Sequence, residues 1–146
     1  MQSLSMVGGE SMAKIKFTSQ IIRQAFRYRL QGSQRMKKIV CDTVAIFPEE
    51  IIKHVVNKCW FVSSFEESWA FALRGDELNK DEHLIFLSDD LLQQDVDQIR
   101  WTIAHEIGHV ILEHKNAILE RQSKADIKKQ EREADEFANR YLYKNR

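Results

Sequence analysis

One helical segment constrains this chain more than any other, because it is apolar almost all the way round and still carries ionisable side chains. It runs from Trp101 to Leu112 and contains the sequence HEIGH at residues 105–109. On a helical wheel, isoleucine and valine residues lie opposite the histidines, and tryptophan, alanine, glycine and leucine flank them. A helix of this kind must be buried. Buried imidazole and carboxylate groups are costly unless they are paired or bind something, so the segment predicts a functional polar site on a buried helix.

The five residues 105–109 form an HExxH motif. Residues four apart on a helix lie on one face, so His105 and His109 can bind one zinc ion at about 2.0–2.1 Å each. Glu106 lies about 100° round the helix from His105, where it can reach a water molecule without being a ligand. In such sites the glutamate takes the proton from the water as it attacks a carbonyl. We therefore predict His105 and His109 as metal ligands and Glu106 as the catalytic residue.

A catalytic zinc site needs a third protein ligand and leaves its fourth position to water. His114 is the nearest candidate in the sequence, but on a continuous helix it lies about 180° from His105 and faces away from the metal. The spacing also lacks the metzincin pattern HExxHxxGxxH, because Leu112 and Lys115 stand at two of its positions. We expect His114 to be a helix-terminus residue, where a cation suits the helix dipole.

The next helical segment offers a better third ligand, within the sequence EREAD at residues 131–135. Glu131 and Asp135 share a face on which small and apolar residues lie, and the alanines there would allow close approach to the first helix. Glu133 lies about 200° from Glu131 and is expected to point to solvent. We predict Glu131 as the third ligand and Asp135 as the acceptor for the outer N–H of a zinc histidine. The alternative is an ordinary exposed face, because the region is rich in charge.

Together these two segments resemble the ImmA/IrrE-type zinc metallopeptidases. HEIGHVILEH at 105–114 and EREADEFANRYL at 131–142 are similar to the family's HExGHxxLxH motif and its ExEAxxFAxxLL-like segment. The resemblance covers roughly residues 61–143, and it departs at Tyr141-Leu142, where the family more often has two leucines. It implies a gluzincin-like fold with a short three-stranded sheet, an active-site helix and a Glu-bearing helix, and it assigns Glu131 as the third ligand.

The resemblance also implies a function. Members of the family often cleave a DNA-binding repressor and so switch on phage, mobile-element or stress genes. We therefore expect a zinc-dependent metalloendopeptidase, with Zn²⁺ as cofactor and a regulatory protein such as a repressor as substrate. Two alternatives stay open. One is a zinc-containing protein that binds or sequesters a partner with little or no proteolysis, and the other is a helical interaction module in which the motif is a coincidence.

The composition excludes several other classes of protein. The chain has 22 basic and 22 acidic residues, hence no net charge, whereas a nucleic-acid-binding domain is usually basic. With 43% hydrophobic residues it is too apolar for a disordered chain. No apolar run approaches the roughly 20 residues that span a bilayer. We expect a folded protein that acts on a protein or peptide, with no direct nucleic-acid binding and no membrane association.

The cysteines and the N-terminus favour a cytoplasmic protein. Cys41 and Cys59 have no CxxC spacing and make no disulfide framework, so we expect two reduced, partly buried thiols. The first ten residues lack the basic and apolar regions of a signal peptide.

The expected architecture is a flexible leader at residues 1–13 and a single metallopeptidase domain at 14–146. Within this domain, residues 14–58 form a helical N-terminal part, including a helix from Pro48 to about Lys58, and residues 59–146 form the minimal catalytic core. Apolar runs at 60–65, 69–73 and 83–87 are separated by turn signals and predict an antiparallel sheet. The fold class is therefore α+β: a small three-stranded antiparallel sheet, an HExxH helix, a Glu-bearing C-terminal helix and N-terminal helices.

Overall fold

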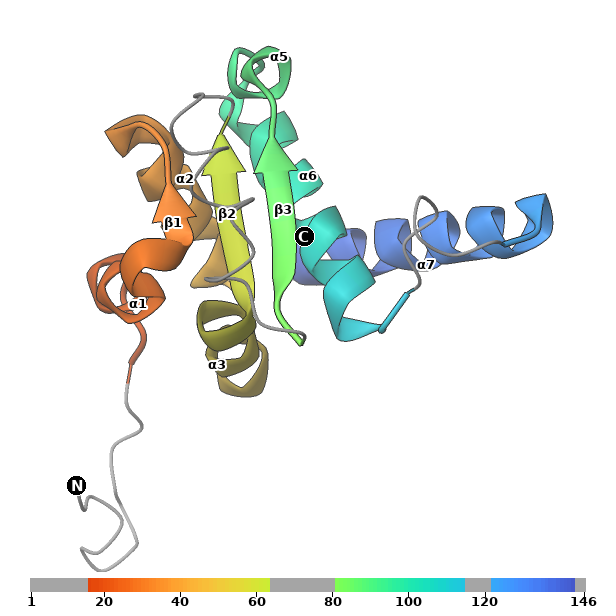
Figure 1. Ribbon diagram of the computed structural model, residues 1–146, viewed down its shortest axis with the longest axis horizontal. Coiled ribbons are helices and arrows are strands. Elements are labelled where there is room, and N and C mark those ends of the chain that lie inside the picture. The colour runs from red at the N-terminus through yellow and green to blue at the C-terminus, as the bar shows by residue number, and fades with distance from the viewer. Residues whose placement is uncertain (1–15, 64–80, 115–121, 144–146) are drawn as a thin grey trace, which may run out of the picture.

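The computed structural model describes residues 16–63, 81–114 and 122–143 (Figure 1). Their elements, in chain order, are α1 (Ser19–Phe26), the 3-10 turn η2 (Arg27–Arg29), β1 (Leu30–Gln31), α2 (Gln34–Val44), α3 (Glu49–Lys58), β2 (Cys59–Ser63), β3 (His83–Leu87), α5 (Asp89–Leu92), α6 (Val96–Ile111) and α7 (Lys124–Tyr143). The predicted helix after Pro48 and the two long C-terminal helices are confirmed. None of the helices in these stretches has the length and apolar character needed to cross a membrane.

The three described strands form one sheet in the order β1-β2-β3, and both neighbouring pairs are parallel. Phe61 in the central strand is paired with Leu30 on one side and with Ile85 on the other. The α+β class is correct, but the predicted antiparallel sheet is wrong. The third strand is not the run at 69–73, which lies outside the described residues. It is β1, within the stretch 14–58 that the sequence predicts to be helical.

The parallel pairing follows from the connections between the strands. Parallel strands need a crossover of a dozen or more residues, whereas antiparallel strands need only a short turn. The chain passes through α2 and α3 between β1 and β2, and residues 64–82 separate β2 from β3. Every residue of β2 is buried, which is the continuous apolar pattern of a central parallel strand. The sequence at 59–63 carries this signal, and the antiparallel prediction is wrong because it treats the segment as one of three short runs joined by turns.

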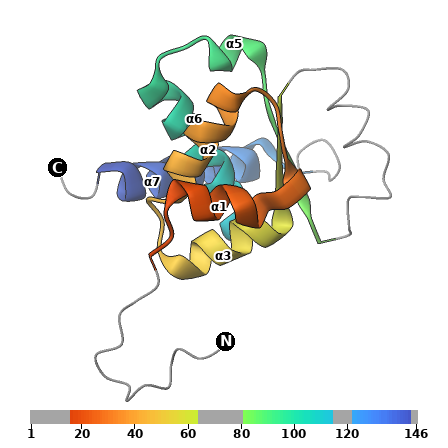
Figure 2. The same ribbon diagram turned by 90° about the vertical axis from the view of Figure 1, so that its left-hand side faces the viewer.

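The described helices pack on one face of the sheet. In Figure 2 the sheet is seen nearly edge-on, and these helices lie on one side of it. From the covered face, Phe61, Ile85 and Leu87 enter a core shared with α1, α2, α3, α6 and α7. The opposite face carries a smaller cluster of Trp60 and Val62, with Leu84 packed against it. The helix of the HExxH motif is therefore part of the main core.

A side-chain cap fixes where α6 begins. Asp95 precedes the helix, and its Oδ1 accepts a hydrogen bond from the backbone N–H of Gln98 at 3.0 Å. Such a cap satisfies a donor that the helix itself cannot pair. Because the start of the helix is fixed, the directions in which His105 and His109 project are fixed as well.

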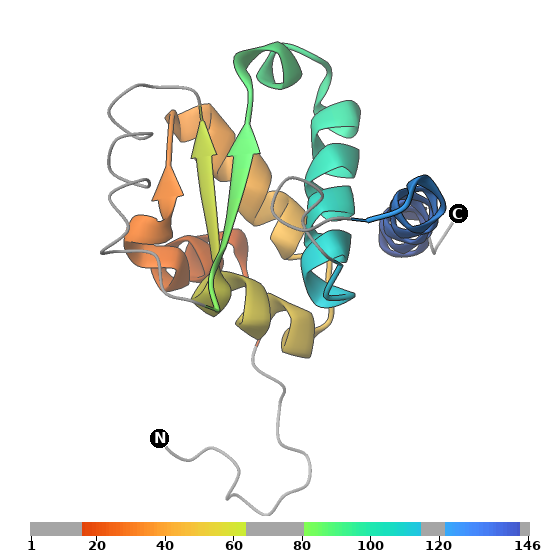
Figure 3. The ribbon, with the colours of Figure 1, turned by 45° about the vertical axis from the view of Figure 1, so that its right-hand side comes forward.

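Helices α6 and α7 cross at a steep angle, since α6 runs upright in Figure 3 while α7 is seen nearly end-on. Small residues allow the crossing. Ala134 and Ala138 of α7 are fully buried, as the prediction of a close approach requires. On α6, a Cβ atom at Gly108 would lie only 3.0–3.1 Å from atoms of the Phe137 side chain. The missing side chain of Gly108 thus makes room for Phe137, and α7 can reach the histidines.

Replacing Gly108 tests this packing. Phe137 is only 7% exposed, so it has little room to move, and Gly108→Ala should push the two helices apart. We expect the free energy of unfolding to fall by about 1–3 kcal/mol, as is typical of an overpacked core, in urea denaturation. In an uncrowded helix the same change would add about 1 kcal/mol of stability, so a gain in stability would contradict the contact.

The two cysteines are both free and buried, as the sequence predicts. Burial raises the pKa of the Cys41 thiol to about 11 and that of Cys59 to about 12. Because the thiolate is the reactive form, both should be inert in the folded protein. We expect no reaction with a thiol-labelling reagent at pH 8 in the native state and two labelled thiols in denaturant. Rapid labelling of the native protein would contradict the buried positions.

Candidate metal centre

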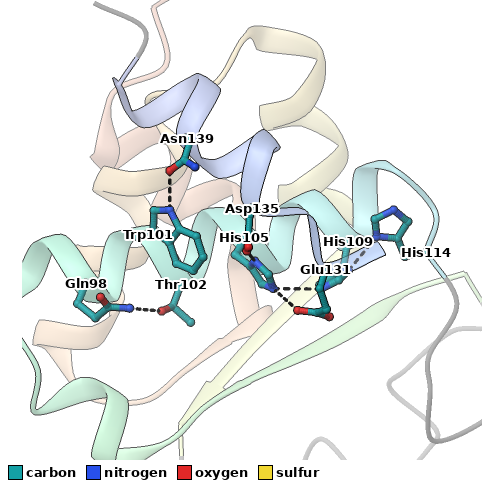
Figure 4. Close-up of polar contacts among 9 residues, drawn as sticks. All are labelled: Gln98, Trp101, Thr102, His105, His109, His114, Glu131, Asp135 and Asn139. Atoms are coloured by element: carbon teal, nitrogen blue, oxygen red, sulfur yellow. Dashed lines mark hydrogen bonds and ion pairs between the residues drawn. The ribbon is translucent and has the colours of Figure 1, made fainter. Parts of the chain in front are cut away.

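Helix α6 presents both imidazoles of the HExxH motif on one face. The Nε2 atoms of His105 and His109 lie 3.2 Å apart, and Figure 4 shows the two rings side by side along the helix. Their side chains are 11% and 22% exposed. Two such nitrogens close together favour a cation between them, because each neutral imidazole offers a lone pair there.

Glu131 approaches the same point from α7. Its Oε1 lies 3.1 Å from Nε2 of His105, and its Oε2 lies 3.1 Å from Nε2 of His109. Donors at about 2.0–2.1 Å from a tetrahedral zinc ion lie about 3.3 Å from one another, so these separations fit one ion. Among the residues that the structure describes, His105, His109 and Glu131 form the group of side chains that could hold a metal ion, called the metal group below. The Glu131 side chain is 54% exposed, which leaves the group open to solvent.

The ring of His105 is supported on two further sides. Oδ1 of Asp135 lies 2.9 Å from Nδ1 of His105, where the sequence predicts an acceptor. This nitrogen has no well-aligned hydrogen bond, so the contact is one of charge and proximity. The Trp101 ring stacks on His105 with centroids 5.2 Å apart, and its Nε1 donates to Oδ1 of Asn139 at 2.9 Å. Asp135 and Trp101 thus restrict how this imidazole can turn.

Glu106 occupies the next position of α6 and is partly buried. Burial raises the pKa of its carboxyl group, and the charge of Glu131 adds to this, while His105 acts in the opposite direction. A raised pKa makes a carboxylate a stronger base. Burial also lowers the pKa of His109, as do His105 and His114, against the opposing effect of Glu131. Both shifts follow from partial exclusion of water from this face of α6.

The structure places His114 differently from the prediction. Helix α6 ends at Ile111, and Glu113 adopts a positive φ of 57°, so the chain turns back. His114 is brought beside His109, with their Nδ1 atoms 2.9 Å apart, and its side chain is only 6% exposed. The assumption of a continuous helix through His114 is wrong, but His114 lies on the outer nitrogen of His109 and is not part of the group that could hold a metal.

Glu133 also differs from its prediction. Its Oε1 lies 2.9 Å from Nε2 of His114, and its side chain is 38% exposed, so it does not simply point to solvent. The contact arises because the turn after α6 brings His114 to α7. Neither Gly nor Pro occurs in residues 110–114 to mark the end of the helix. Sequence reasoning therefore missed both residues of this pair.

Comparison with known proteins points to the same region. The sequence model of the Peptidase U49 family matches residues 94–146, a little over a third of the chain. This stretch contains α6, α7 and all three residues of the candidate metal group. The chain has no match among curated proteins or solved structures. A peptidase family is thus matched on the segment that carries the His-His-Glu arrangement.

The role of Glu131 can be tested against a neighbouring carboxylate. Glu131→Ala removes one of three donors, so we expect zinc affinity to fall at least 100-fold in competition with a chromophoric chelator. Glu136 lies on the same helix and is exposed, so Glu136→Ala should bind zinc as the unaltered protein does. Equal affinities in the two variants would show that Glu131 is not a ligand.

Proposed function

We propose that this chain is a zinc-dependent metallopeptidase that hydrolyses a peptide bond in another protein. The observation that carries the proposal is the convergence of His105, His109 and Glu131 on one point. All three contacts among their donor atoms measure 3.1–3.2 Å. Two imidazoles and one glutamate form a known ligand set of catalytic zinc, which keeps its fourth position open.

The side chains of the site have separate roles in this reaction. A zinc ion, when bound, lowers the pKa of a water molecule to about 7 and polarises a peptide carbonyl. Glu106 takes the proton from the attacking water and gives it to the nitrogen of the leaving amine. Partial burial suits Glu106 to this role, because a carboxylate with a raised pKa accepts a proton more readily. Asp135 and Trp101 keep the His105 ring turned toward the site.

An extended peptide can be placed along β3. This strand lies at one end of the sheet order, and no other strand among the described residues pairs with its outer edge. Peptides often bind by adding a strand to such an edge. We propose that the substrate lies along β3, which would bring its backbone past the end of the Glu131 side chain.

The family resemblance and the Peptidase U49 match support a proteolytic role with a regulatory substrate. We propose that the chain is related to the ImmA/IrrE-type peptidases, acts in the cytoplasm and cleaves a DNA-binding repressor or a similar protein. We also propose that residues 14–146 act as one domain, with 59–146 as the catalytic core. Side chains of α1, α2 and α3 share one hydrophobic core with those of α6, which supports this organisation.

The function is tested by Glu106→Gln. We expect this variant to bind zinc as the unaltered protein does but to lose at least 100-fold in peptide hydrolysis, because general-base catalysis contributes factors of this order. Mass spectrometry of a diverse peptide library gives the readout, because it detects cleavage at any sequence that the protein accepts. Asp97→Asn is the matched control, because Asp97 is an exposed carboxylate on the same helix.

Two results would contradict the peptidase. Equal cleavage by Glu106→Gln and the unaltered protein would remove Glu106 from the reaction. A zinc-loaded protein that captures a partner but cleaves no peptide, with or without the substitution, would instead support the binding or sequestering role.

A further inference from the structure

A chain of polar contacts begins at His109, one of the three donors of the metal group, and leads away from that group. Its Nδ1 lies 2.9 Å from Nδ1 of His114, and Nε2 of His114 lies 2.9 Å from Oε1 of Glu133. His109 and His114 are drawn in Figure 4. Neither His114 nor Glu133 belongs to the metal group. The contacts thus connect a carboxylate on α7 to the outer nitrogen of a candidate ligand.

The direction of these hydrogen bonds follows from what each atom can do. An ionised carboxylate only accepts, so Nε2 of His114 carries a hydrogen and donates to Glu133. A neutral imidazole has one N–H and one lone pair, which leaves Nδ1 of His114 as an acceptor. The hydrogen between the two Nδ1 atoms then belongs to His109. Nε2 of His109 is then left with a lone pair that faces the metal position. Oε2 of Glu131 lies 3.1 Å from this nitrogen and, without a cation between them, would favour a hydrogen on it, so the contacts of His114 and Glu133 oppose that effect.

We infer that His114 and Glu133 are positioning residues that hold His109 in the tautomer able to bind a metal. The inference rests on the proposed metal centre. The opposite tautomer would carry a hydrogen on Nε2, between the donors, and would have to lose or move it before binding. His114 and Glu133 act through His109, and neither is among the donors that could hold the metal.

The backbone after α6 supports this assignment. The positive φ of Glu113 is uncommon for a residue other than glycine, and it turns the chain back at this point. The backbone N–H of His114 then donates to the carbonyl oxygen of His109 at 2.9 Å. This local turn places the buried His114 ring against His109 and within reach of Glu133.

The two candidate histidine ligands are supported in different ways. His105 has the carboxylate of Asp135 directly beside its Nδ1, whereas His109 reaches the carboxylate of Glu133 through an intervening imidazole. Both carboxylates come from α7, as does Glu131. The one helix that supplies the third ligand therefore also supports the outer nitrogens of both histidines.

Zinc affinity of purified variants tests the inference without an activity assay. Loss of such outer contacts typically weakens metal binding 10–100-fold. We expect that range for His114→Ala and about 10-fold for Glu133→Ala, measured by chelator competition. His114→Asn should bind zinc more tightly than His114→Ala, because its amide oxygen can take the place of Nδ1 and accept from His109. Glu136→Ala is the surface control.

A spectroscopic measurement reports the tautomer itself. In zinc-free Glu131→Ala, where this carboxylate no longer favours a hydrogen on Nε2 of His109, long-range ¹H–¹⁵N spectra of the imidazole rings should show His109 protonated at Nδ1. Adding His114→Ala to this variant should shift the same ring toward protonation at Nε2. Circular dichroism verifies that each variant is folded. If His114→Ala does not fold, Glu133→Ala provides both readouts.

Distinct outcomes separate this inference from the proposed function. Normal zinc binding by the unaltered protein, with unchanged affinity in His114→Ala and Glu133→Ala, would overturn the inference alone. So would an equal loss of affinity in His114→Asn and His114→Ala, or a His109 ring protonated at Nε2 in zinc-free Glu131→Ala. If the unaltered protein binds no zinc, the metal centre is overturned and this inference with it.

Discussion

The close approach of α6 and α7 brings a carboxylate of one helix to two imidazoles of the other. Gly108 leaves space that Phe137 occupies, and Ala134 and Ala138 are buried without side chains that would hold the helices apart. Because of this contact, Glu131 lies within 3.1 Å of both histidines. Without it, α6 would be a buried helix with two unsupported histidines, which is an unfavourable arrangement. The polar group therefore depends on the packing of small side chains beneath it.

Partial burial gives the group its electrostatic character. Desolvation is the largest cause of both the raised pKa of Glu106 and the lowered pKa of His109. Each shift favours the neutral form of its group, as removal from water must. A neutral imidazole can bind a metal, and a carboxylate of raised pKa accepts a proton more readily. The same partial burial thus favours both the metal-binding form of His109 and the basicity of Glu106.

The sequence was informative where structure depends on local periodicity. The spacing of His105 and His109, and the shared face of Glu131 and Asp135, follow from helical geometry, and the structure brings all four side chains together. The direction of the sheet was not accessible in this way, because it depends on how distant strands are connected. The His114–Glu133 contact depends on where α6 ends. Two residues after that end, Glu113 adopts a left-handed conformation, and no glycine or proline marks this position in the sequence.

The donors of the candidate centre come from two helices, and residues 110–130 separate His109 from Glu131. An ion held by these two residues would bind the folded chain in preference to the unfolded one, and would so tie α7 to α6. The buried side chains of α7 are those of Ala134, Phe137 and Ala138, a small apolar contact for a helix of 20 residues. Anchoring of the C-terminal helix would then depend on the free concentration of the ion, so the supply of metal would regulate how long the folded chain survives as well as whether it can act.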